Sequence, residues 1–144
     1  MPNIRKASFA VALAALPVFA GALTLQISNP AANAEAKAKN AAALVQVLAC
    51  HSPEKTIVTA AAIGSNSQVI PLKVFPLSVP GLYAVIREWP QTGSWVIKFV
   101  AANPDYKNYA TGALVPYKDS NVEWSQAKSY FHEPNAQDVN GLLK

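Results

Sequence analysis

The chain has 144 residues, is 51% hydrophobic, and carries a formal charge of +4 from 12 Lys and Arg against 8 Asp and Glu. Only 14% of the residues are charged, whereas about 25% are charged in an average soluble domain. The single cysteine excludes an intramolecular disulfide framework and a cysteine-rich metal cluster. The lysines are spread singly along the chain, so we expect no nucleic-acid partner.

Residues 1–34 have the pattern of a secretory leader. Arg5 and Lys6 precede an uncharged apolar stretch at residues 7–25, and small residues follow it. A basic start, an apolar centre and an Ala-x-Ala end are typical of a signal peptide. The pattern predicts a secreted or periplasmic protein that has no membrane span once the leader is removed.

The end of the leader is open to two interpretations. Cleavage after Ala34 is favoured because Ala32 and Ala34 flank a single residue, and cleavage after Ala22 is the second candidate. A retained membrane anchor is the alternative to cleavage, because the apolar run is nearly long enough to span a bilayer. Pro17 and Gly21 interrupt that run and favour a cleaved leader.

Residues 35–43 are rich in Ala and Lys and have no apolar stripe, so we interpret them as a tether rather than a nascent helix. The segment at residues 44–124 then contains short apolar runs separated by Pro, Gly, Asn and Ser. These runs are residues 44–50, 56–63, 69–75, 82–88, 94–101 and 109–115, with a weak seventh near 122–124. Such spacing predicts an all-β fold, an antiparallel immunoglobulin-like or transthyretin-like β-sandwich of six or seven strands.

Alternation within two of the runs predicts which residues face the core. Trp95, Ile97 and Phe99 share one face of the fifth run, and Lys98 lies opposite them. The fourth run places three apolar residues on one face, namely Leu82, Ala84 and Ile86. Residues 89–93 read as a hairpin connection, which would make these two runs neighbouring strands of one core.

The tail at residues 125–144 has a different pattern. Pro134 suits the first position of a helix, and Val139, Leu142 and Leu143 would share one side of it. We expect one short C-terminal helix, lying against the sandwich or free of it.

The segment at residues 70–100 contains a Pro-Gly-x-Tyr strand followed by a Gly-x-Trp strand, with Gly81, Tyr83, Gly93 and Trp95 at the defining positions. It resembles small exported β-sandwich modules of the FixH/YtkA-like kind and transthyretin-like modules of the carboxypeptidase regulatory-like kind. The resemblance implies an exported sandwich without catalytic residues. It therefore supplies no site residue and no cofactor.

Metal binding is the sharpest chemical alternative. Cys50 and His51 are adjacent, and His132 could join them to hold copper or zinc. Consecutive strand residues point to opposite faces, however, so Cys50 is also interpreted as a small buried hydrophobe. We find no serine triad, no paired carboxylates and no phosphate-binding glycine loop, so we expect no enzyme activity and no cofactor.

The aromatic residues divide into two groups. Tyr83 and Trp95 lie in the central runs and are expected in the core. Tyr106 and Tyr109 lie in a loop and are candidates for partner binding. The sequence thus favours an exported, non-enzymatic module that binds a protein or envelope component or supports an envelope assembly. The alternative is a periplasmic copper- or zinc-handling protein.

Overall fold

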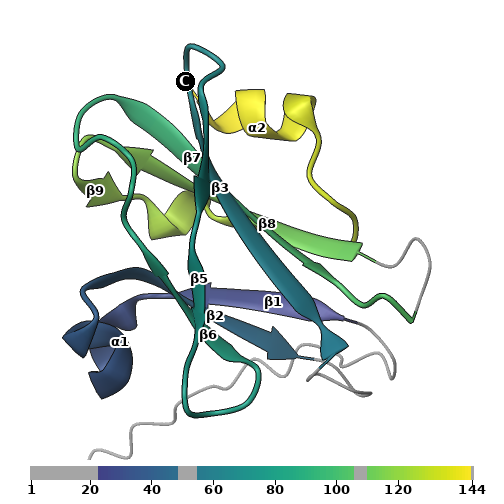
Figure 1. The fold of residues 1–144 in the computed structure, drawn as a ribbon. Helices are drawn as coiled ribbons and strands as arrows, with labels where there is room; N and C mark the ends of the chain where they lie inside the picture. Colours follow the sequence, from purple (N-terminus) through teal and green to yellow (C-terminus); the bar gives the residue numbers. More distant parts are fainter. Residues whose placement is uncertain (1–22, 49–54, 106–109, 144) are drawn as a thin grey trace, which may run out of the picture.

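The computed structural model describes residues 23–48, 55–105 and 110–143, which form two packed antiparallel sheets with short helices outside them (Figure 1). The first sheet has the order β1 (Thr24–Ser28), β2 (Ala41–Leu48), β6 (Leu82–Ile86), β5 (Val74–Pro76). The second has the order β10 (Lys128–Tyr130), β8 (Ala110–Lys118), β7 (Ser94–Ala102), β3 (Ile57–Gly64), β4 (Val69–Leu72), and β9 (Asn121–Val122) also pairs with β8. The all-β sandwich is therefore confirmed.

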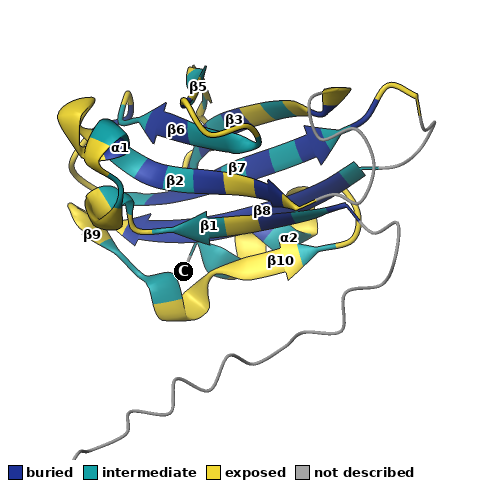
Figure 2. Cartoon of the chain, turned by 90° about the horizontal axis from the view of Figure 1, so that it is seen from below, coloured by how far each residue is buried: buried dark blue, intermediate teal, exposed yellow. Residues whose placement is uncertain are grey.

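The main core lies between the two sheets. Figure 2 shows buried positions recurring along β2, β7 and β8. Trp95, Ile97 and Phe99 all face this core and are buried, as their period of two predicts. Tyr83 packs against the same cluster and is partly buried. The central strands thus use one face each to fill the space between the sheets.

The fourth run differs from its prediction, because β6 and β7 lie in different sheets. Val85 of β6 is buried in the main core, whereas Ala84 is buried on the outer face of its sheet. The connection between the two strands crosses from one sheet to the other instead of forming a hairpin. Its Trp89 is buried and packs edge-on against Tyr117, with ring centroids 5.0 Å apart. The buried ring anchors this connection to the main core.

The first described residues also differ from the prediction. β1 occupies part of the segment interpreted as leader, and helix α1 (Ala34–Ala38) together with the start of β2 occupies the segment interpreted as a tether. Leu25 is buried in the main core, and Ala36 is buried against the outer face of the first sheet. Packing therefore stabilises a short Ala-rich helix that would be marginal alone. A 3-10 turn, η1 (Pro30–Ala32), joins β1 to α1.

The C-terminal helix is α2 (Ala136–Leu142), close to the predicted position, and it lies against the second sheet. Before it lie a 3-10 turn, η3 (Trp124–Gln126), and strand β10. The described residues form ten strands, since β1 and β10 were not predicted and the third run divides into β4 and β5. No helix in the described ranges is long and apolar enough to cross a bilayer.

Candidate binding groove

Four of the residues singled out by the sequence lie outside the described residues. They are Cys50, His51, Tyr106 and Tyr109. The roles predicted for them, in metal binding and in partner binding, therefore stay predictions. The fifth, His132, lies in the segment between β10 and α2.

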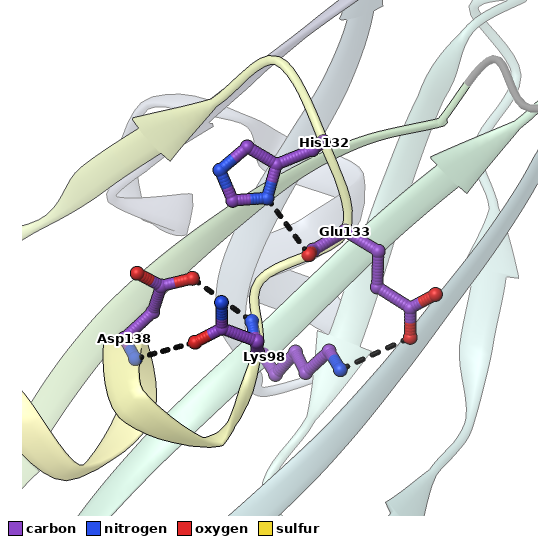
Figure 3. A network of polar contacts seen from close by, with 5 residues as sticks. Lys98, His132, Glu133 and Asp138 are labelled. Atoms are coloured by element: carbon purple, nitrogen blue, oxygen red, sulfur yellow. Dashed lines mark hydrogen bonds and ion pairs between the residues drawn. The ribbon is translucent and has the colours of Figure 1, made fainter.

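His132 is exposed and makes only local contacts. Its Nδ1 lies 2.9 Å from the main-chain oxygen of Glu133 (Figure 3). Its ring also meets that of Tyr130 edge-on, with ring centroids 5.4 Å apart. Within the described ranges, no group of three or more His, Cys, Asp or Glu side chains is placed to hold a metal ion. His132 alone is thus one imidazole on a surface segment.

The segment leading into α2 is fixed on the sheet by a proline. Pro134 is fully buried and lies over Gly112 of β8, where an added Cβ would overlap the proline ring. A glycine is required here for close approach rather than for an unusual backbone conformation. The chain therefore crosses the outer face of the second sheet in direct contact with it.

Helix α2 begins with a complete capping box. The Asn135 side chain accepts a hydrogen bond from the Asp138 main-chain N–H at 3.0 Å, and the Asp138 carboxylate accepts one from the Asn135 N–H at 2.9 Å. These bonds satisfy two N–H groups that a helix start would otherwise leave without partners. Val139 then packs on Val96 and Leu114, which are fully buried on the outer face of the sheet. The helix is held both at its start and along its apolar side.

Lys98 lies on the same outer face of the sheet and is paired with the segment before α2. Its Nζ lies 3.0 Å from Oε1 of Glu133, and its side chain is only 21% exposed (Figure 3). The pair joins β7 to a residue 35 positions later in the chain. It neutralises a cation that would otherwise stand alone beside an apolar surface.

A half-open groove lies between α2 and the β3–β4 hairpin. Its volume is about 320 Å³, at the lower end of the range typical of ligand pockets, about 300–1,000 Å³. Five apolar side chains contribute to its walls, Ile63, Val69, Ala136, Val139 and Leu143. The polar groups at its margin include Lys98, Asn135 and Asn140. Val69 is 58% exposed, so this wall faces solvent.

The groove lining contains few chemically reactive side chains. The described residues that line it include the hydroxyls of Ser65 and Ser67 but no imidazole, thiol or carboxylate. On the segment before α2, the pKa of the Tyr130 phenol is raised, first by burial and second by the Asp138 carboxylate. A hydroxyl without a neighbouring base is a poor nucleophile. The groove is therefore suited to holding an apolar group among hydrogen-bonding partners.

Sequence reasoning did not identify this groove. Its walls come from residues 63–69 and 135–143, and nothing in either segment shows that they meet. Two signals were present, Lys98 in an otherwise apolar strand and the Asn135/Asp138 spacing of a capping box. Both indicate how α2 is held rather than the groove beside it.

In comparisons with known proteins, no protein-family model, no curated protein and no solved structure matches the chain. The resemblance carried by Gly81, Tyr83, Gly93 and Trp95 therefore stays a prediction.

Proposed function

We propose that the protein is an exported, non-enzymatic β-sandwich module that binds a protein partner through the groove between α2 and the β3–β4 hairpin. The observation that supports this most directly is the groove itself, an apolar depression of about 320 Å³ whose single lysine is already neutralised by Glu133. A site of this kind accepts an apolar side chain and surrounds it with hydrogen-bonding groups.

The polar margin suggests what the partner presents. Asn135 and Asn140 carry amides that donate and accept hydrogen bonds, and Ser65 and Ser67 add hydroxyls. Such groups pair with main-chain N–H and C=O groups. The proposed ligand is therefore a peptide segment that inserts one large apolar side chain, such as Leu or Phe, and lays its backbone along the margin.

Matched surface variants test this proposal. Val69→Arg places a long cation in the groove wall, whereas Ile57→Arg places one at the other end of the same sheet face. The two parent residues are 58% and 59% exposed, so neither substitution removes core packing. Partners copurified with the native protein from its host are identified by mass spectrometry, and their binding to both variants is measured. Binding lost in Val69→Arg and kept in Ile57→Arg supports the proposal.

The opposite result would contradict it. Partners bound equally by both variants must use another surface, including the loop that carries Tyr106 and Tyr109. A native protein that copurifies with nothing and hydrolyses a substrate would refute the non-enzymatic class.

Export is part of the same proposal, and β1 bears on the cleavage site. Cleavage after Ala34 would remove β1 and with it Leu25, which is buried in the main core. Cleavage after Ala22 would keep the strand, and Ala20 and Ala22 supply the Ala-x-Ala pattern. We therefore favour Ala22. N-terminal sequencing of material from outside the cytoplasm should begin at Leu23, and a start at Glu35 or Met1 would contradict this.

The alternative function, copper or zinc handling by Cys50, His51 and His132, is tested separately. Metal analysis of the purified protein should find less than one equivalent of either ion. Stoichiometric metal that is lost in Cys50→Ala and His51→Ala variants would favour the alternative. His132→Ala then shows whether the exposed imidazole takes part.

A further inference from the structure

Strand β1 forms one free edge of the first sheet and differs from the other described edges. It pairs with β2 through five consecutive residues without a register shift. It contains no proline and no charged residue. By contrast, β5 is three residues long and ends in Pro76, β4 carries Pro71, and β10 is a three-residue strand that carries Lys128. Short strands, prolines and lysines are the usual protection of an edge against pairing with another chain, and β1 lacks all three.

The hydrogen bonds between β2 and β6 show which backbone groups of β1 point away from β2. The N–H of Val47 donates to the Gly81 oxygen at 2.8 Å, on the side of β6. Backbone groups alternate in direction along a strand, so those of Gln46 point to β1, where Gln46 lies opposite Gln26. The N–H and C=O groups of Leu25 and Ile27 therefore point away from β2. Within the described ranges, no strand pairs with this edge.

The same strand is complementary to itself when it is reversed about Gln26. Leu25 and Ile27 then face each other, and both direct their side chains to the core. Thr24 faces Ser28, and both are polar. A two-fold axis requires this kind of self-complementary patch, in which each residue meets its counterpart in both directions.

We propose that β1 is the edge through which two copies of this protein form a dimer. The two β1 strands pair antiparallel about Gln26, and the two first sheets join into one. Leu25 exchanges both main-chain hydrogen bonds with Ile27 of the partner subunit, and the reverse pair follows by symmetry. Gln26 lies opposite Gln26 of the partner subunit as a pair without main-chain bonds, where side chains come closest. Their exposed amides can then bond to each other.

This inference is independent of the proposed partner groove. The groove is lined by residues of α2 and of the second sheet, and none of its lining residues belongs to β1. Failure of one proposal therefore leaves the other standing.

A charge at Gln26 tests the dimer without touching the core, because this side chain is exposed. The chain is purified with the N-terminus that the producing cell leaves on it, and its mass is followed by sedimentation over a range of concentrations. The native protein should approach twice the monomer mass. Gln26→Lys should raise the dissociation constant about tenfold or more, because two like charges then stand directly opposite.

Two further measurements make the result specific. Gln46→Lys adds the same charge on the same exposed face, one strand away from the edge, and should leave the dissociation constant unchanged. An equimolar mixture of Gln26→Lys and Gln26→Glu should restore dimers, because opposite charges then meet across the axis. A native protein that stays monomeric at every concentration, or a Gln26→Lys variant that dimerises as the native protein does, overturns the proposal.

Discussion

The two ends of the described chain perform similar tasks by different means. The N-terminal arm, residues 23–40, adds β1 to the first sheet and lays α1 on the outer face of that sheet. The C-terminal arm, residues 124–143, adds β10 to the second sheet and lays α2 on its outer face. Each arm thus supplies one edge strand and one short helix.

The arms differ in which element carries the packing. In the N-terminal arm the strand does so, because Leu23 and Leu25 are buried in the main core while α1 buries only Ala36. That helix is fastened instead by the Glu35 carboxylate, which accepts hydrogen bonds from the Ser78 hydroxyl at 2.7 Å and N–H at 3.1 Å. These bonds from Ser78 lower the pKa of Glu35.

In the C-terminal arm the helix carries the packing. Val139 is buried in a separate cluster with Val96 and Leu114, while the residues of β10 are exposed or half-buried. The N-terminal arm therefore contributes to the main core between the sheets, whereas the C-terminal arm packs on the outer face of a sheet whose core face is already covered.

Truncation of each arm should separate these roles and gives the largest expected effect. A chain that begins at Glu35 loses two buried leucines, at about 2–5 kcal/mol each, from a domain held by about 5–15 kcal/mol. It should show no cooperative thermal transition by circular dichroism. A chain that ends at Glu133 should keep its β spectrum and melt at a lower temperature, and a chain that begins at Leu23 is the control. Equal behaviour of the two truncations would remove the distinction between the arms.

The phenol of Tyr117 joins the second sheet to the start of β2, where the N-terminal arm enters the domain. Its hydroxyl donates to the Ala42 main-chain oxygen at 3.2 Å, and burial raises the pKa of Tyr117 to about 12. An unfolded tyrosine ionises near pH 10, so this residue should lower the free energy of unfolding as pH rises from about 10 to 12. The loss should total about 3 kcal/mol, and the ionisation of Tyr117 should cause no loss of stability below about pH 10.

Tyr117→Phe is the control for this titration. Denaturant unfolding at several pH values should show a shallower alkaline decline in Tyr117→Phe than in the native protein. The same decline in both proteins would assign it to other groups.

Two glycines test how closely the C-terminal arm lies on the sheet. Gly112→Ala places a methyl group against Pro134 and near the Phe99 main-chain oxygen, and should destabilise the protein by about 1–3 kcal/mol. Gly141→Ala in α2 meets nothing within 4 Å and should stabilise it by about 0.5–1 kcal/mol. Chemical denaturation measures both. A neutral Gly112→Ala would show that the arm moves off the sheet easily.

The helix caps should give the smallest effects. Asn33 accepts a hydrogen bond from the Ala36 N–H at 2.9 Å, and Asn135 has the matching role in α2. Replacement of either by Ala should cost about 1 kcal/mol in thermal unfolding experiments. Only Asn135→Ala should also weaken partner binding, because Asn135 lines the groove. A loss of binding in Asn33→Ala instead would place the partner on the other arm.

Much of the sandwich could be predicted, because apolar and polar residues alternate along some of its strands and turn residues bound the others. The seven apolar runs correspond to β2 through β9, and Trp95, Ile97 and Phe99 are in the core. The Pro80-Gly81 pair lies in a turn, where the Leu82 N–H donates to the Val79 main-chain oxygen at 3.1 Å and Gly81 has φ +81°.

The N-terminal arm was missed for a physical reason. Leu23 and Leu25 continue the apolar run of the leader, so composition alone does not separate a signal sequence from a core strand. Ala36 buries little surface and leaves no periodic signal. The groove was missed because it depends on where α2 rests relative to Val69, which is a tertiary property.

Strands β4 and β5 are separated by the single residue Lys73 and belong to different sheets. One extended stretch therefore forms the margin of both sheets on the side of the sandwich opposite β1 and β10 (Figure 2). Pro71 and Pro76 each lack an N–H group there, so this margin is a poor template for another strand. Growth of a fibril requires each molecule to pair with others along two edges. A molecule that can pair along one edge only stops at the dimer.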